Sequence, residues 1–247
     1  MDTNLILSIV VVTKDNPNDL ICTLESLTNL SNSEIIVVNG SHNKVSLNGK
    51  LRQELCCLTV LDGPDDGIYD GMNRGIWLAK GQYVWFLNSG DRNTIFGFYE
   101  GLISLLSKKS PPWIIGMQTP YLKFPRLGLY LSKALLLMGI RPIPHQSVIV
   151  KKSLLINFAG YDTRHRIAAD QKLFLQLYQE NQLPFLVYVP FSERKLGGIG
   201  DMQIHGSFFK QIKEISKEIS LDNPTWTILL SNPLRFLQAC KKNLSRK

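Results

Sequence analysis

Three features that would place a protein in a familiar class are missing from this sequence. Its 247 residues contain no apolar run of the roughly 18–20 residues that a membrane-spanning helix needs. Its four cysteines include no pair at the C-x-x-C spacing of zinc or redox sites, so we interpret them as small, buried, reduced side chains. The apolar run 5–12 follows an acidic residue and precedes no small-residue cleavage site, which favours a cytoplasmic protein over a secreted one.

The composition is that of a globular protein with a basic charge balance. Hydrophobic residues make up 44% and charged residues 19% of the chain, and the length suits one domain of about 200–250 residues. The net charge is +8, and part of the excess gathers at Lys241, Lys242, Arg246 and Lys247. A local basic cluster indicates an attachment surface for an anionic partner, and we expect no nucleic-acid groove.

The first ninety residues alternate between β-branched apolar runs and segments with helical spacing. We expect strands buried on both faces at 5–12, 34–38, 58–61 and 82–87. We expect helices at 17–30, around Leu51 and at 68–79. This alternation predicts an α/β fold with a mostly parallel sheet, whose ligands bind at the carboxyl ends of the strands. The loops at that edge begin at Thr13, Asn39, Asp62 and Asn88.

The remaining sequence is more mixed and contains no internal repeat or clear linker. We expect helices at 94–107, 127–139, 168–180 and 203–220. We expect strands at 113–117, 146–150 and 185–189. We therefore predict one domain over residues 1–220, followed by a basic amphipathic tail at 221–247.

The segment Asn88-Ser-Gly-Asp91 follows the fourth expected strand. Hard oxygen ligands suit a divalent cation that holds a diphosphate, and Asp91 with Ser89 or Asn88 supplies such oxygens. An Asp after Gly at a strand end is also a common turn residue. The segment by itself is compatible with either interpretation.

A polar block at 65–75 opens the helix expected at 68–79. Asp70, Asn73 and Arg74 lie within one helical turn, at the sheet edge where ligands bind. The alternative is an ordinary helix start, where the macrodipole favours acids.

Two further groups lie in the second half of the sequence. Asp170 opens an amphipathic helix, where its carboxylate suits a general base that takes a proton from an attacking hydroxyl. The alternative is a plain helix N-cap. His145, with Gln146 beside it, follows two prolines, and it is either a structural histidine or a group that contacts a metal or a phosphate.

Taken in chain order, these motifs resemble family 2 glycosyltransferases of the GT-A fold. The resemblance rests on Gly67-Ile-Tyr-Asp-x-Met-Asn73, Asn88-Ser-Gly-Asp91, His145-Gln146, Ala168-Ala-Asp170 and Gly197-Gly-Ile199. It covers residues 5–200 and looks closest to small bacterial members that build exopolysaccharide, colanic-acid or O-antigen repeat units. It implies an inverting enzyme that uses a nucleotide-diphosphate sugar, expected to be a UDP-sugar, with Mg²⁺ or Mn²⁺. The implied acceptor is a hydroxyl of a polyprenyl-diphosphate-linked saccharide.

The resemblance also implies a role for each matching position. Asp170 matches the catalytic base, and Asp91 matches the chief metal ligand, with Ser89 and His145 as further candidates. The nucleotide and donor sugar would be bordered by Thr13, Asn39, Asp65, Tyr69, Asp70, Asn73 and Asn88. Residues 1–92 would then form the nucleotide-binding half of the domain, and residues 93–220 the acceptor half.

Three positions depart from the family pattern. Asn39 stands where the family usually has Asp, Ser89 replaces the first carboxylate of the D-x-D metal element, and Lys172 replaces a second acid after the base. These changes favour an alternative hypothesis, a non-catalytic sugar-nucleotide- or membrane-binding protein on a decayed transferase fold. The retained Asp91 and Asp170 favour catalysis. A nucleotidyltransferase would need a Gly-rich basic phosphate loop, which residues 12–15 do not supply.

Two segments suit the surface of a membrane. Residues 127–139 are strongly apolar with Arg126 and Lys133 nearby, and residues 226–237 carry aromatic and aliphatic bulk before the basic cluster. Such a combination is typical of an interfacial anchor, and the alternative is a docked helix with a solvated tail. We expect a cytoplasmic protein that binds peripherally to the anionic inner face of the cell membrane.

Overall fold

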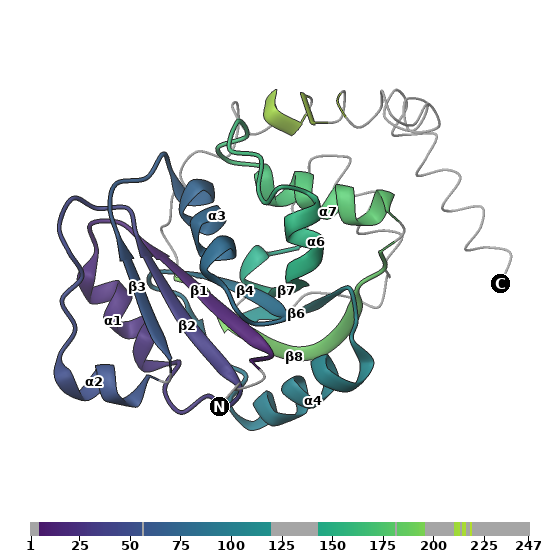
Figure 1. Ribbon diagram of the computed structural model, residues 1–247. Coiled ribbons are helices and arrows are strands. Elements are labelled where there is room, and N and C mark those ends of the chain that lie inside the picture. Colours follow the sequence, from purple (N-terminus) through teal and green to yellow (C-terminus); the bar gives the residue numbers. More distant parts are fainter. Residues whose placement is uncertain are drawn as a thin grey trace, which may run out of the picture.

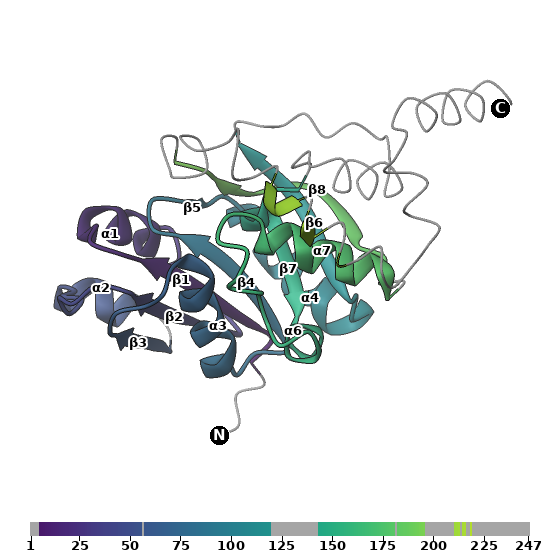
Figure 2. The ribbon, with the colours of Figure 1, turned by 90° about the horizontal axis from the view of Figure 1, so that it is seen from above.

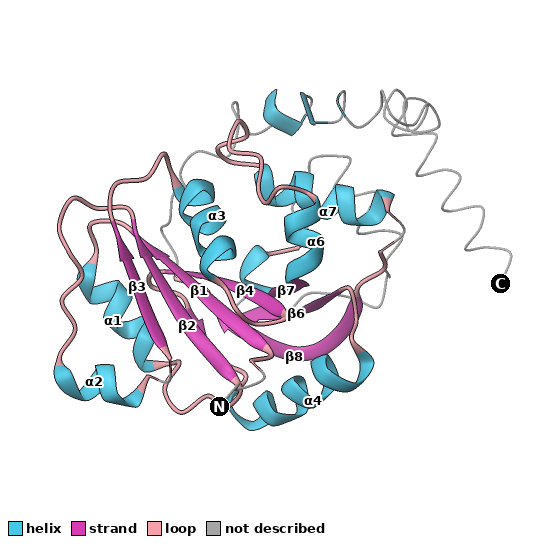
Figure 3. Ribbon diagram, viewed as in Figure 1, coloured by secondary structure: helices cyan, strands magenta, loops and turns pink. Residues whose placement is uncertain are grey.

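The sheet at the centre of the molecule has helices on both of its faces (Figures 1 and 3). The computed structural model describes residues 5–55, 57–119, 143–180, 182–195, 210–212, 214–215 and 218. In these residues, eight strands form one curled sheet in the order β3-β2-β1-β4-β7-β6-β8-β5. The predicted α/β fold is confirmed.

The first half of the sheet is parallel. Its strands are β1 (Leu7–Thr13), β2 (Ser33–Asn39), β3 (Leu58–Asp62) and β4 (Tyr83–Asn88). The helices between them are α1 (Pro17–Glu25), α2 (Gly49–Glu54) and α3 (Ile68–Leu78). β1 pairs in parallel with β2 and β4, and β2 pairs in parallel with β3, as the alternation of strands and helices predicts.

The second half of the sheet is mixed. After β4 come β5 (Arg92–Asn93), the 3₁₀ helix η1 (Phe96–Phe98), α4 (Tyr99–Lys109) and β6 (Trp113–Thr119). From residue 145 onward come η2 (His145–Ser147), β7 (Val148–Lys151), α6 (Lys152–Asn157), α7 (Ala169–Gln179) and β8 (Phe185–Glu193). β7 is antiparallel to β4 and β6, whereas β8 is parallel to β6 and antiparallel to β5.

Several element boundaries differ from the sequence prediction. α1 ends at Glu25 and not near residue 30, since the hydroxyl of Ser26 turns back to the carbonyl of Thr23 at 2.6 Å. The helix expected from residue 94 begins at 99, after the side chain of Asn93 accepts the N–H of Ile95 at 2.9 Å. The strand expected from 146 begins at 148, and β5 and α6 are additional elements.

Some expected elements fall on residues that the structure does not describe. The helix at 127–139, the motif at 197–199 and the tail at 221–247 lie outside the described residues. Of the helix expected at 203–220, the described residues between 210 and 218 are helical. Among the described helices, none combines the length and the apolar character that crossing a membrane requires.

The core has two parts, one on each face of the sheet. Val10 packs with Met72 of α3 and Phe174 of α7, whereas Ile9 packs in the opposite cluster with Leu24 of α1. Successive side chains of a strand point to opposite faces, so both faces of β1 are apolar and covered. Each fully buried aliphatic side chain stabilises the fold by about 1.5–3 kcal/mol.

Helix α3 lies unusually close to the sheet. A Cβ atom on Gly75 would come within 2.3 Å of Cγ1 of Val10, and a Cβ on Gly71 would lie 3.5 Å from Cγ1 of Val12. Glycine at position 75 lets the helix backbone approach β1, whereas the 3.5 Å separation at position 71 is ordinary van der Waals contact. This close packing sets the first turn of α3 at the edge of the sheet where the strands end.

Candidate active site

The four loops predicted to carry the chemistry lie at one edge of the sheet. In the parallel register, Thr13 is opposite Asn39, Asn39 is opposite Asp62, and Val12 is opposite Asn88. The carboxyl ends of β1, β2, β3 and β4 are therefore aligned. This edge is where ligands bind in open α/β sheets.

Asp170 lies in the first turn of α7 and is 4% exposed. Its Oδ1 accepts hydrogen bonds from the hydroxyl of Tyr69 at 3.0 Å and from the N–H of Gln171 at 2.9 Å. Its Oδ2 lies 3.9 Å from Nδ1 of His145. Its place in the first turn puts the carboxylate near the positive end of the helix dipole. A buried and oriented carboxylate of this kind suits general-base chemistry.

Tyr69 joins the polar block of α3 to the start of α7. Its hydroxyl also lies 3.2 Å from the carbonyl of Ile167, and its ring packs against Tyr161 at 5.3 Å between centroids. Burial raises the pKa of Tyr161, and the negative charge of Asp170 raises it further, so this neighbour stays neutral. Tyr69 is predicted to border the donor. The structure adds a hydrogen bond from its hydroxyl to Asp170, the predicted base.

Asp91 is buried in the turn after β4 and is 3% exposed. Its carboxylate accepts the N–H of Asn88 at 3.0 Å and the N–H of Lys195 at 3.2 Å. Burial raises the pKa of Asp91 to about 6, while these two bonds and one from the side chain of Gln146 lower it in part. The buried carboxylate of Asp91 thus fixes the turn after β4 through hydrogen bonds from backbone N–H groups.

Among the residues that the structure describes, none donates a hydrogen bond to the side-chain oxygen of Asn88. Its Nδ2 lies 3.3 Å from Nε2 of His145, while its Oδ1 is buried and makes no hydrogen bond among the described residues. An unmet buried acceptor costs about 1–3 kcal/mol unless a ligand or water meets it. The oxygen therefore marks a place for a ligand at the strand edge.

The oxygens of this turn fit the divalent cation that the family resemblance implies. A carboxylate offers about four acceptor positions, and the three donors on Asp91 leave capacity for a cation, beside the unmet Oδ1 of Asn88. The hydroxyl of Ser89 lies 3.4 Å from the carbonyl of Asn16 and keeps acceptor capacity of its own. His145 lies between Asn88 and Asp170, within reach of both.

Asp65 is held between β2 and α3. A Cβ on Gly40 would come within 2.1 Å of Oδ2 of Asp65, so the glycine makes room for the carboxylate. Oδ1 of Asp65 accepts the N–H of Gly67 at 3.2 Å and lies 3.8 Å from Nζ of Lys14. The carboxylate is thus fixed beside the carboxyl end of β2.

Asn73 and Asp70 are engaged within the protein. The amide of Asn73 pairs in both directions with the backbone of Tyr161, at 2.8 and 2.7 Å. Asp70 forms an ion pair with Arg74 at 3.1 Å and accepts the N–H of Asp66 at 3.2 Å. Both residues fix the walls of the site, and their predicted contacts with the nucleotide or sugar stay predictions.

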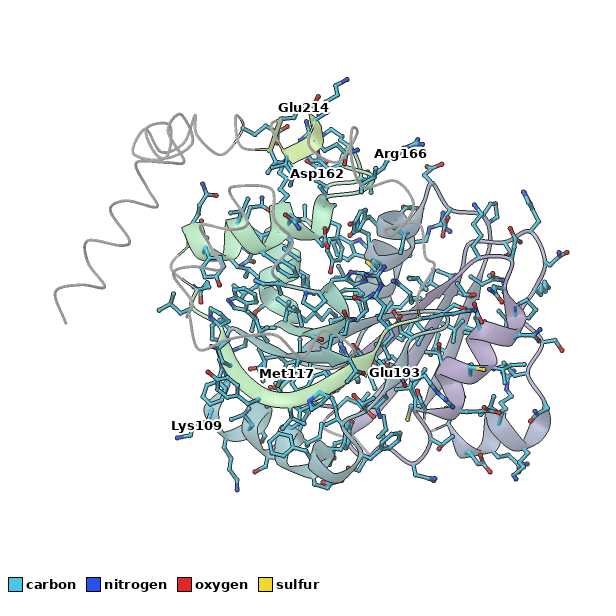
Figure 4. All side chains as sticks on the ribbon, turned by 180° about the vertical axis from the view of Figure 1, so that it is seen from behind. Lys109, Met117, Asp162, Arg166, Glu193 and Glu214 are labelled. Atoms are coloured by element: carbon cyan, nitrogen blue, oxygen red, sulfur yellow. The ribbon has the colours of Figure 1, made fainter. Side chains whose placement is uncertain are left out.

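A second charged cluster lies on the far side of α7, where Figure 4 labels Asp162. The ammonium of Lys172 lies 2.6 Å from Asp162 and also contacts Glu218. The ring of buried His165 lies 3.8 Å from Asp162 and 3.6 Å from Glu218. Two carboxylates and an imidazole could hold a cation, but Lys172 already supplies the positive charge. This cluster attaches residue 218 to α7. In the view from above, the yellow-green helical segment that begins at residue 210 lies next to α7 (Figure 2).

Gln146 has a structural part in the site that its sequence position beside His145 does not reveal. Its carbonyl accepts the indole N–H of Trp85 at 2.7 Å, and its Oε1 accepts from Gln118 at 3.2 Å. Its side chain also bonds to Asp91. Gln146 therefore connects the predicted metal turn to β6. The His-Gln motif was the signal that could have found it.

Comparisons with known proteins find similar sequences. Residues 8–106 match the family model described as glycosyl transferase family 2. An uncharacterized glycosyltransferase of Mycobacterium tuberculosis is 37% identical over 117 residues, which are 46% of this chain and 45% of that protein. A PGL/p-HBAD biosynthesis glycosyltransferase of Mycobacterium bovis is 24% identical over 60% of this chain and 59% of its own. The chain thus spans about half the length of the curated relatives it matches.

Solved structures share the fold. TarS of S. aureus has a TM-score of 0.65 at 15% identity, over 87% of this chain and 40% of its own. A mannosyltransferase of Pyrobaculum calidifontis, solved with GDP-Man and Mn²⁺, has a TM-score of 0.59 at 13% identity, over 98% of this chain and 80% of its own. The chain therefore shares the fold of these glycosyltransferases, and its residues 8–106 resemble glycosyl transferase family 2.

Proposed function

We propose that this protein is an inverting transferase that moves a sugar from a nucleotide-diphosphate sugar, a UDP-sugar, to a hydroxyl of a lipid-linked saccharide. The observation that carries the proposal is the buried Asp170, oriented by Tyr69 at the carboxyl edge of the sheet. The structure of TarS with UDP-GlcNAc supports a nucleotide-sugar donor, because the two chains share a fold.

In this mechanism the acceptor oxygen attacks the anomeric carbon on the side opposite the diphosphate. Asp170 takes the proton from that oxygen as the new bond forms, and the bond to the diphosphate breaks. Tyr69 and the N–H of Gln171 hold the carboxylate in place. A divalent cation held by Asp91 and Asn88, with Ser89 or His145, would offset the charge on the leaving diphosphate. Placement of the two reactants supplies much of the rate.

The acceptor and the site of action are also proposed. The apolar segment 127–139 and the basic cluster near residue 241 suit binding to an anionic membrane, where a polyprenyl-diphosphate-linked saccharide would lie. Synthesis of a surface polysaccharide, such as an O-antigen or exopolysaccharide, follows from that acceptor class. We also propose that residues 1–92 form a nucleotide-binding half and residues 93–220 an acceptor half. Asp170, which would take the proton from the acceptor hydroxyl, lies in the second half.

The test is a panel of sugar nucleotides with Mg²⁺ or Mn²⁺ and a lipid-diphosphate saccharide, with binding measured beside transfer. We expect one donor to be consumed only with metal and acceptor present, and its product to have the inverted anomeric configuration. If a donor binds and no product forms with any acceptor, the non-catalytic hypothesis becomes the better one. If no nucleotide binds, the transferase and the sugar-nucleotide-binding alternative both fail, and the membrane-binding alternative remains.

A further inference from the structure

Asn39 and Asp62 form a pair across the ends of β2 and β3. They are directly opposite in the parallel register, and Nδ2 of Asn39 donates to Oδ1 of Asp62 at 2.8 Å. Nδ2 also donates to the carbonyl of Asn43 at 2.7 Å, and Oδ1 of Asn39 accepts the N–H of Ser41 at 3.1 Å. Both amide hydrogens are therefore used within the protein, and Asn39 is 3% exposed.

The amide at position 39 is required by its neighbours. Two acceptors, the carboxylate of Asp62 and the carbonyl of Asn43, face the same atom of Asn39. An Asp at this position would bring a carboxylate oxygen to hydrogen-bond distance of both acceptors with no proton between them. Like charges at that separation are unfavourable. The family's usual Asp at position 39 and the Asp at position 62 therefore exclude each other.

Asp62 supplies a carboxylate at the end of β3, the strand next to β2. Its Oδ1 accepts from Asn39 and from the N–H of Val45 at 2.9 Å. The hydrogen bond from Asn39 lowers the pKa of Asp62, so the group is charged at neutral pH. Within the described part of the chain, no donor meets its Oδ2, and the residue is exposed. One oxygen is fixed and the other is open to a ligand.

We propose that Asp62 is the carboxylate that recognises the base of the donor, with its open Oδ2 accepting the imide N–H of a uracil. The assignment rests on the proposed function, because it names the nucleotide contact of that same site. Asn39 is then a positioning residue that holds Asp62. The family's usual carboxylate at position 39 is absent, and Asp62 on β3 supplies a carboxylate in its place. Uridine specificity would survive the change.

The test exchanges the two side chains and measures UDP binding by calorimetry. Asp62→Asn should weaken UDP binding roughly tenfold or more, the scale of one hydrogen bond to a charged group. Asn39→Asp should lower both UDP affinity and the unfolding midpoint, because the two carboxylates repel. The double variant Asn39→Asp with Asp62→Asn removes the repulsion between two carboxylates, so it should recover part of the stability that Asn39→Asp loses, while its UDP affinity stays as weak as that of Asp62→Asn, because no carboxylate remains at position 62. Glu25→Gln, an exposed acid-to-amide change on α1, is the matched control.

A modified ligand separates the base contact from a general loss of charge. UDP methylated at N3 lacks the imide N–H, so it should bind wild type and Asp62→Asn equally weakly. If Asp62→Asn binds UDP as wild type does, or if methylated and plain UDP bind wild type alike, the assignment is wrong. It is also wrong if wild type binds GDP and not UDP, although the proposed transferase function would survive. If wild type binds no nucleoside diphosphate, the proposed function itself fails.

Discussion

At the scale of single residues, the proposed chemistry depends on how Asp170 is held. Its carboxylate lies buried in the first turn of α7, and two hydrogen bonds fix its orientation. One of those bonds comes from Tyr69, which is 101 positions away in the sequence. The Gly-Ile-Tyr-Asp block, predicted to border the donor, therefore also positions the proposed base.

Removal of the Tyr69 hydroxyl should separate turnover from binding. We expect Tyr69→Phe to lower kcat roughly tenfold, because Asp170 loses a hydrogen bond made to its charged form, and to change UDP affinity little. Steady-state kinetics and calorimetry measure the two quantities. Tyr188→Phe, at a tyrosine that is 64% exposed on β8, is the control. Equal losses in both quantities would point to a purely structural role for Tyr69.

At the scale of elements, the packing of α3 on β1 sets the site edge. Gly75→Ala adds a methyl that meets Val10 within 2.3 Å, so the helix must shift or the strand must adjust. We expect a loss of about 1–3 kcal/mol in the free energy of unfolding, measured by urea denaturation. Gly97→Ala is the matched control, because its new methyl meets nothing within 4 Å. An unchanged midpoint for Gly75→Ala would contradict this account of α3.

The charged cluster on α7 predicts how stability depends on pH. The hydrogen bond from Arg164 lowers the pKa of Asp162, and that from Lys172 lowers the pKa of Glu218. Because the folded pKa values lie below the ordinary 3.8 and 4.5, the stabilisation is present above those values and is lost as pH falls through the lowered ones.

Lys172→Met should therefore destabilise the protein near neutral pH by roughly 1–3 kcal/mol, because two carboxylates lose their shared cation. The difference from wild type should shrink below pH 4, in urea denaturation at several pH values. Lys80→Met, at an exposed lysine, is the control. A constant difference across that range would show that the charges do not cause it.

At the scale of the whole molecule, the sequence predicts best where the strands are buried on both faces. β1, β2 and β4 are built around β-branched apolar runs, and their predicted parallel arrangement in one sheet is confirmed. β5 has two residues, and β8 pairs with β6 through register shifts, so neither has a strong periodic pattern. Helix starts also shifted where a local side-chain bond competed, as at Asn93.

The sequence predicts which residue types lie at the carboxyl edge of the sheet. It does not predict which of these residues form hydrogen bonds with one another. Thr13, Asn39 and Asn88 follow strand ends that the register aligns. The pairings of Tyr69 with Asp170 and of Asn39 with Asp62 join distant parts of the chain, and periodicity holds no information about them. These partnerships emerge only when the strands and helices pack.

The proposed membrane attachment also belongs to the scale of the whole chain. If the basic cluster and the apolar segment 127–139 anchor the protein, it should co-sediment with vesicles containing anionic lipid at low salt. About 1 M salt, where the Debye length is near 3 Å, should release most of it. Neutral vesicles are the control. Failure to bind anionic vesicles at low salt would contradict peripheral attachment.

The central claim is tested most directly by Asp170→Asn, with transfer and UDP binding measured on the same preparation. The isosteric change keeps the shape and removes the base. The account predicts that transfer falls roughly 10²-fold or more while UDP affinity and the unfolding midpoint change little. Transfer at the wild-type rate would show that Asp170 is not the base and would contradict the proposed mechanism.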